Sequence, residues 1–408
     1  MTLLDEAQGL LEDAVAVRRR IHRHPEIGLQ LPETQKVILD VLEGLPLEVQ
    51  TGSRLTSVTS TLDGGHPGPT ILLRGDMDAL PMPEDTGLDF ASEIEGAMHA
   101  CGHDTHVAML LQAARLLADH RDALHGRVLF MFQPGEEGYH GARVMIEDGL
   151  LDGDIPPSAA FAIHIISHLA AGHVYTRPGP LLASSDRLQI SVKGRGGHAS
   201  APYLAQDPVP VACEVVQALQ TMVTRKFNVF DPTVVTIASI HTGSTDNVIP
   251  EAAAMEGTAR ALTEETRGSV LDNVRRIVEG VAGAHGLIGE LTVDAGYPPT
   301  VNDQAMTSFA VDVARDLLGE GLVEIMEHPR MGSEDFSYVL QRVPGAMLNL
   351  GVASPDDPNP PANHSNRMMV EEPAMANGIA LYAGLALKYL GRHSRQRNAR
   401  RLLRPVSD

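Results

Sequence analysis

The sequence lacks the features that mark several protein classes. It has only two cysteines among 408 residues, too few for a disulfide framework, so a reducing cytoplasm is the expected location. No apolar stretch is long enough to cross a bilayer, which argues against a membrane partner. The N-terminus is acidic and amphipathic, without the apolar segment of a signal peptide. We therefore expect a cytoplasmic globular protein, and its length favours two domains.

Positive charge is also scarce. Lys and Arg number 32 against 52 Asp and Glu, which gives a formal net charge of −20. A protein that binds a phosphate backbone needs a basic surface, so no nucleic-acid partner is expected. The one basic run lies near the C-terminus, and residues 391–408 are predicted to form a solvated basic tail.

Side chains that bind transition metals are concentrated in the segment 98–106, MHACGHDTH. It contains His99, Cys101, His103, Asp104 and His106. Thiolate, imidazole and carboxylate groups are ligands of borderline transition metals. Apolar residues at helical spacing follow, so the cluster is expected on a loop leading into a helix over about 104–119. A metal site is favoured, and the alternative is a polar turn with a buried cysteine and a capping aspartate.

Carboxylates follow two predicted buried strands. The apolar run 70–73 leads to Asp76 and Asp78, at the strand end where open α/β sheets bind their ligands. These two aspartates either bind metal directly or orient another group, and the orienting role is favoured for at least one of them. The run 127–132 leads to Glu136 and Glu137.

Adjacent residues of a strand point to opposite faces, so the two glutamates can address one site only if the backbone turns there. Gly135 and Gly138 permit such a turn. The pair suggests a division of labour in which one glutamate binds metal and the other handles protons. The residues alone leave open which is which.

Further histidines lie on other predicted elements. His164 interrupts the apolar run 159–165, where a lone histidine is usually a core residue, but the other candidates favour a ligand. His364 lies on a Pro- and Asn-rich loop after a predicted strand over 346–350. In the N-terminal run RRRIHRHPE, His22 is interpreted as polar support more readily than as a ligand.

The strand pattern changes near residue 184. Half-buried, alternating strands are predicted over 187–193, 233–240, 253–261 and 290–294, with helices over about 207–223 and 264–284. The order β-α-β-β-α-β is the ferredoxin-like arrangement. We therefore expect an inserted domain over 185–297 within a larger domain formed by 1–184 and 298–390. The inserted domain carries His198 on a glycine-rich loop, which is otherwise a surface hairpin turn, together with Asn247 and Arg260.

The motifs in combination resemble the M20 metallopeptidase family. Within it, the resemblance is to the amidohydrolase branch of hippurate hydrolases, aminoacylases and auxin-amino-acid conjugate hydrolases, over about residues 10–390. The motifs are RRxxHxxPE at 18–26, RGDMDALP at 74–81, HACGHDTH at 99–106, QPGEEG at 133–138, GxGGHAS at 194–200, DNVIP at 246–250, GSEDF at 332–336 and NHS at 363–365.

The resemblance implies an α/β fold in which a larger mixed-sheet, zinc-peptidase-like catalytic domain carries an inserted ferredoxin-like α+β lid that also dimerises. It implies two divalent metal ions per subunit: zinc, or manganese, cobalt or nickel. The implied metal ligands are Cys101, His103, Glu137, His164 and His364. Glu136 would be the general base and Asp78 a further catalytic residue. His198 would stabilise the oxyanion, in some relatives across a homodimer.

The expected reaction is hydrolysis of the amide bond of N-acyl-L-amino acids, with Asn247 and Arg260 as candidate partners of the substrate carboxylate. A dipeptidase and an N-acetyl-diaminopimelate deacetylase of the same family are the alternatives. No group suited to holding a free amine stands out, which favours acylated substrates. A non-catalytic binding protein on this scaffold is less favoured because no ligand is replaced, and a structural zinc site normally has only four ligands.

Overall fold

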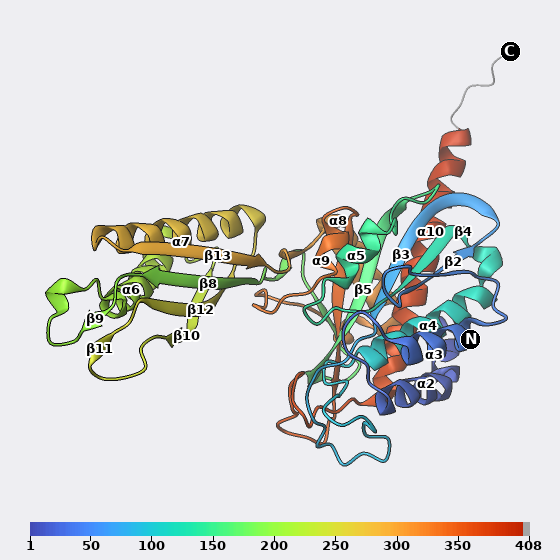
Figure 1. Ribbon diagram of the computed structural model, residues 1–408. Helices are drawn as coiled ribbons and strands as arrows, with labels where there is room; N and C mark the ends of the chain where they lie inside the picture. The colour runs from blue at the N-terminus through green and yellow to red at the C-terminus, as the bar shows by residue number, and fades with distance from the viewer. Residues whose placement is uncertain (403–408) are drawn as a thin grey trace. The chain divides into compact units, whose positions relative to one another are not determined.

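The computed structural model describes the backbone of residues 1–402 and the side chains of residues 1–392. This part of the chain forms two compact units (Figure 1). The larger unit contains Met1–Gly179, Asn302–Glu327 and the described residues from Tyr338 onward, and the smaller unit contains Pro180–Val301 and His328–Ser337.

The segment 328–337 belongs to the smaller unit, although the sequence predicts it to be part of the larger domain. The reason is a set of backbone hydrogen bonds. The N–H of Arg330 donates to the carbonyl of Leu181, and the N–H of Ala183 donates to the carbonyl of Gly332. Such backbone pairing leaves no mark on side-chain composition, so a sequence pattern does not reveal it.

Within the described residues, the larger unit contains an eight-stranded mixed sheet, as predicted. Its strands in spatial order are β1 (Glu48–Thr51), β2 (Val58–Asp63), β4 (His125–Gln133), β3 (His66–Asp76), β5 (Pro157–Ala170), β16 (Gly345–Ala353), β6 (Val174–Thr176) and β15 (Val323–Ile325). The central strands β4, β3, β5 and β16 run parallel. Strands β2 and β6 join this core in antiparallel orientation.

The central strands are continuous apolar segments because both of their faces are covered. Ile71, Leu72 and Leu73 of β3 are fully buried, as is Phe161 of β5. Strands β3 and β4 end side by side, with Asp76 opposite Gln133 in the register. The polar residues that follow the two strands therefore start from one edge of the sheet.

Helices pack against this sheet and against one another. The helices of the larger unit are α1 (Leu3–Gly9), α2 (Leu11–Arg23), α3 (Pro32–Leu42), α4 (His103–Asp119), α5 (Gly141–Glu147), α8 (Gln304–Leu318) and α10 (Met375–Leu402), and the short α9 (Ser337–Leu340) begins on the last residue of the smaller unit. Close approach of α10 to its neighbours relies on glycine: Gly378 lies against Met109 of α4 and Leu350 of β16.

The N-terminal segment forms two helices, because Leu10 separates α1 from α2 directly after Gly9, a poor helix former. The predicted basic tail begins inside a helix, since α10 continues to Leu402. Residues 403–408 of that tail lie outside the described residues. Among the described residues, no helix is long and apolar enough to span a membrane.

The smaller unit has the predicted order of strands and helices. Its four-stranded antiparallel sheet has the spatial order β10 (Val234–His241), β12 (Ala252–Arg260), β8 (Asp186–Lys193) and β13 (Ile288–Ala295). Helices α6 (Pro208–Lys226) and α7 (Glu264–Ala284) pack on it through a core that includes Leu188, Val215 and Val274 (Figure 1). This is the ferredoxin-like arrangement. A two-stranded ribbon of β9 (Gly197–His198) and β11 (Val248–Ile249) extends from it, and β7 (Gly179–Leu182) and β14 (Thr300–Asn302) lie where the chain passes between the units.

Candidate metal centre

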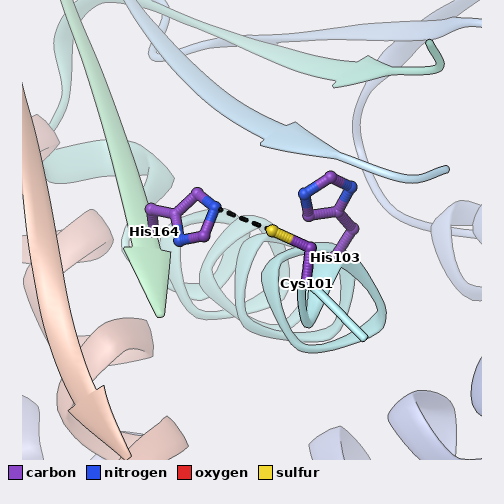
Figure 2. A group of neighbouring side chains, drawn as sticks. All are labelled: Cys101, His103 and His164. Carbon is purple, nitrogen blue, oxygen red and sulfur yellow. Dashed lines mark hydrogen bonds between the residues drawn. The ribbon is translucent and has the colours of Figure 1, made fainter. Parts of the chain in front are cut away.

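Five predicted ligands come from four segments of the larger unit. Cys101 lies just before α4, and His103 is the first residue of that helix, one position earlier than predicted. Gly102 between them has a left-handed backbone with φ of 87°, which a glycine adopts without strain. Glu137 follows β4, and His164 lies on β5. Figure 2 shows Cys101, His103 and His164 around one point.

The donor atoms of these five residues form two overlapping groups. Those of Cys101, His103 and His164 lie within 4.8 Å of one another, and so do those of Cys101, Glu137 and His364. The Sγ atom of Cys101 is 3.4 Å from Nε2 of His164, and Nε2 of His364 is 3.3 Å from Oε1 of Glu137. Because Cys101 belongs to both groups, the arrangement suits two neighbouring cations that share one thiolate.

The state of His103 tests whether these residues fit a metal. Both ring nitrogens are buried, and neither has a hydrogen-bond partner. The carboxylates of Asp76 and Asp78 lie 3.3 and 3.4 Å away without hydrogen-bond geometry. A buried imidazole without hydrogen bonds is costly unless something else binds it. Together with the thiolate and carboxylate nearby, this fits a transition metal.

The site opens to solvent on one side. The side chain of His364 is 55% exposed, whereas that of His103 is fully buried. His364 also has a left-handed backbone with φ of 68°, a rare conformation for a residue with a side chain. A substrate reaching the metals from solvent would therefore meet the His364 side first.

A sharp turn presents the two glutamates to the same site. Gly135 and Gly138 both have positive φ angles, 72° and 89°, as the sequence predicts for a turn there. Asp78 fixes this turn from the neighbouring strand end. Its Oδ1 accepts the N–H of Glu136 at 2.9 Å, and its Oδ2 accepts the N–H of Glu137 at 2.9 Å. Nothing in the sequence pattern indicates this contact with two backbone amides.

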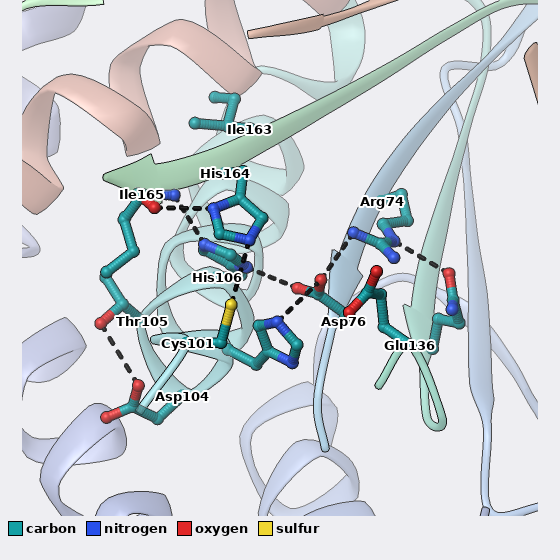
Figure 3. A network of polar contacts seen from close by, with 12 residues as sticks. Arg74, Asp76, Cys101, Asp104, Thr105, His106, Glu136, Ile163, His164 and Ile165 are labelled. Carbon is teal, nitrogen blue, oxygen red and sulfur yellow. Dashed lines mark hydrogen bonds and ion pairs between the residues drawn. The ribbon is translucent and has the colours of Figure 1, made fainter. Parts of the chain in front are cut away.

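A second aspartate, Asp76, forms hydrogen bonds with residues next to the predicted ligands (Figure 3). Asp76 is fully buried and accepts hydrogen bonds from Arg74, at 2.7 Å, and from Nδ1 of His106. Nε2 of His106 accepts the N–H of Ile165, the residue after His164, at 2.8 Å. Both oxygens of Asp76 thus have hydrogen-bond partners, and its role in orienting neighbouring groups stays a prediction.

Asn363 ties three of the ligand segments together. Its side-chain nitrogen donates to the carbonyl of Cys101 at 3.1 Å and to that of Ile165 at 3.2 Å. Its side-chain oxygen accepts the N–H of Ser167 at 3.0 Å. Sequence reasoning identified Asn363 only as part of a motif, because its partners are backbone groups distant in the chain.

The predicted ligands shift one another's pKa values. Contacts with Cys101 and Glu137 raise the pKa of His364 to about 10. Burial disfavours the charged form of Glu137, yet contact with His364 brings the pKa of that carboxyl below its usual value. Burial raises the pKa of the Cys101 thiol. Metal binding at this site therefore has to displace protons, so it weakens at low pH.

The three predicted site residues of the smaller unit do not lie together. His198 on β9 pairs with Val248 on β11, and the N–H of Ala199 donates to the carbonyl of Asn247. Arg260 ends β12, where its guanidinium donates to the carbonyl of Met331 at 2.9 Å.

The sheet register places Arg260 at one end of β12, opposite the end from which the β9–β11 ribbon extends. The N–H of Gly194, just after β8, donates to the carbonyl of Glu251 at the ribbon end of the sheet. A strand of the length of β12 spans about 26 Å. Arg260 and Asn247 therefore lie toward opposite ends of the sheet, and their role as partners of a substrate carboxylate stays a prediction.

Comparisons with known proteins agree with this geometry. The model of peptidase family M20/M25/M40 matches residues 72–388. The chain is 38% identical to thermostable carboxypeptidase 1 of Saccharolobus solfataricus, over 92% of this chain and 95% of the relative. It is 37% identical to the N-acetyl-L-cysteine deacetylase of Bacillus subtilis, over 86% and 83%.

A solved structure of an M20 family member is also similar to this chain. The YXEP protein of Bacillus subtilis, described as a dinuclear metal-binding peptidase of the M20 family, is 34% identical with a TM-score of 0.81, covering 94% of this chain and 99% of that one. The large mixed sheet that the resemblance implied occurs in this chain, which also contains groups of side chains that could hold metal ions. The chain belongs to peptidase family M20/M25/M40 and is a metal-dependent amide hydrolase.

Proposed function

We propose that the protein hydrolyses the amide bond of N-acyl-L-amino acids, using two divalent metal ions per subunit. The observation that carries the proposal is the pair of adjacent glutamates beside a dinuclear ligand set. Glu137 belongs to the group with Cys101 and His364, and both glutamates form a further group with His103, so Glu136 lies next to the predicted ligands. The deacetylase relative supports acylated amino acids as the substrate class.

Different residues of the chain have different roles in the proposed reaction. Divalent ions held by the five ligands would polarise the amide carbonyl and acidify water. Glu136 accepts the proton of the attacking water and then delivers it to the leaving nitrogen. The carboxylate of Asp78 holds the backbone of both glutamates, so Glu136 keeps its place beside the ligand set. His198 donates a hydrogen bond to the developing oxyanion.

We propose that the active form is a homodimer in which His198 and Asn247 serve the site of the partner. Their ribbon lies at the end of the sheet remote from Asp186 and Ala295, where the chain enters and leaves the smaller unit. The ribbon end also exposes apolar side chains: Tyr203 is 83% and Val248 51% exposed. Exposed apolar groups of this kind favour association with a second copy. Arg260, at the other end of the sheet, stays a candidate partner of the substrate carboxylate.

The test is amine release from a panel of N-acyl amino acids with acetyl, benzoyl and longer acyl groups, assayed beside free dipeptides. We expect cleavage of the acylated substrates by the metal-loaded protein, and loss of that cleavage after the metal is removed with a chelator. The rate should fall at least tenfold when the substrate carboxylate is replaced by an amide, because the charged partner of that carboxylate is left unpaired. Cleavage of dipeptides alone would refute the proposal and favour a dipeptidase.

A further inference from the structure

A buried group of charged side chains lies beside the metal centre and has no part in the reaction as proposed. Its members are Arg18, His22, Glu84 and Asp104. Two of them come from the N-terminal RRxxHxxPE motif, which the ligand set does not include. Burying several charges is costly unless each has a partner.

His22 contacts a carboxylate with each of its ring nitrogens. Nδ1 is 2.8 Å from Oδ2 of Asp104, and Nε2 is 3.2 Å from Oε1 of Glu84. A ring that donates to carboxylates on both sides must carry both protons. Burial disfavours this charge, but Asp104 and Glu84 raise the pKa of His22 to about 9. His22 is therefore a fixed, doubly donating cation with 1% of its surface exposed.

Asp104 connects His22 to one part of the metal centre. It follows His103 directly in the first turn of α4 and is fully buried. Arg18 donates from Nε to the hydroxyl of Thr105 at 3.1 Å and lies 3.2 Å from Asp104. The first turn of α4, which carries His103, is thus fastened to α2 through two cations.

Glu84 connects His22 to the part of the metal centre that contains His364. It lies on the long segment between Leu80 and Met98, and its Oε2 accepts the N–H of Ser92 at 2.7 Å. The N–H of the next residue, Asp85, donates to the carbonyl of Asn366 at 2.8 Å. Asn366 is two residues after His364, so the same segment reaches the exposed ligand.

The anchoring of this segment to α2 does not depend on His22 alone. The Phe90 ring lies 5.6 Å from the His22 ring, edge to face, and the guanidinium of Arg19 lies 4.4 Å from its centre. The N–H of Glu93 donates to the carbonyl of Arg23 at 2.8 Å. Removing the His22 contacts should therefore loosen the segment without detaching it.

We propose that His22 is a positioning residue that couples the two ligand groups, by holding Asp104 next to His103 and Glu84 on the segment that supports His364. The inference rests on the proposed function, because it concerns the assembly of the same dinuclear site. Its direct consequence is on metal affinity, because substitution of a side chain that supports the metal ligands typically weakens metal binding by about 10- to 100-fold.

The test is the substitution His22→Gln, with the Zn²⁺ dissociation constant measured by competition with a chromophoric chelator at a temperature where the variant is folded. Glutamine can donate to only one of the two carboxylates, so we expect zinc affinity to fall by about tenfold or more. The thiolate-to-cobalt absorption of the Co²⁺-loaded protein should shift as well. The matched control is Arg20→Gln on the same helix, where the guanidinium pairs only with the exposed Asp40, and its zinc affinity should be unchanged.

A second pair of variants covers the case in which His22→Gln does not fold. Glu84→Ala should lower zinc affinity, and Glu84→Gln, which keeps an oxygen for His22 to donate to, should fall between Glu84→Ala and the unmodified protein. Loss of thermal stability with wild-type zinc affinity and an unchanged cobalt spectrum would overturn the inference. Zinc affinity is measured without substrate, so failure to cleave N-acyl amino acids would refute the proposed function and leave this result standing.

Discussion

Replacing Glu136 with glutamine should lower the turnover number by about 10²- to 10⁴-fold, the usual contribution of a general base, while two metal ions stay bound. The amide cannot accept the proton of the attacking water, but it occupies the same space. The backbone of residue 136 remains bonded to Asp78 through its N–H, so the turn should keep its shape. Because the five ligands are unchanged, metal content measured by mass spectrometry should match that of the unmodified protein.

The adjacent glutamate supplies the matched comparison. Glu137→Gln should reduce metal affinity itself, because Glu137 belongs to the ligand group with Cys101 and His364. Glu147→Gln removes a half-exposed carboxylate on α5 and should change neither the turnover number nor the metal affinity. If the Glu136 variant turned over normally with both metals bound, another group would have to be the base. If it lost metal instead, the assignments of the two glutamates would be reversed.

Replacing His198 with alanine should lower kcat by about 10²- to 10³-fold with little change in metal content, since one donor to the oxyanion is lost. His198 is exposed on the β9–β11 ribbon, at the end of the smaller unit's sheet remote from its connections to the larger unit. The exposure of this ribbon supports the proposal that His198 serves the site of a second copy.

Mixing two inactive variants tests that assignment. When His198→Ala and Glu136→Gln proteins are unfolded together and refolded, mixed dimers should combine an intact Glu136 from one protomer with an intact His198 from the other. About a quarter of the wild-type activity should return if the subunits pair at random. His241→Ala, an exposed histidine of the same unit, is the control and should be fully active. Absence of recovery in mixtures shown to contain mixed dimers would place His198 in its own protomer's site or outside any site.

The sequence was most informative where burial dictates composition. The apolar runs around Ile71, Phe130 and Phe161 predict the central strands, because strands covered on both faces admit few polar residues. The polar residues after them predict the site, since parallel strands end at one edge. Alternating strands and two amphipathic helices predict the ferredoxin-like order of the smaller unit in the same way.

What the sequence could not predict depends on contacts with backbone groups or on distances across a sheet. Asp78 accepts hydrogen bonds from two backbone amides, and Asn363 donates to two backbone carbonyls. Because every residue type except proline has both backbone groups, the sequence does not indicate these partners. The separation of Arg260 from Asn247 follows from strand register, which a single sequence does not give. Which glutamate is the ligand came from family resemblance, because two adjacent glutamates are chemically equivalent in a sequence.

The most direct test of the account is a metal titration of the stripped protein, with the hydrolysis of an N-acyl amino acid followed at each step. Two overlapping ligand groups that share Cys101 predict that zinc binds at two equivalents per chain and that full activity requires both. Binding that saturates at one equivalent per chain, with full activity already reached, would contradict a dinuclear centre built from these residues.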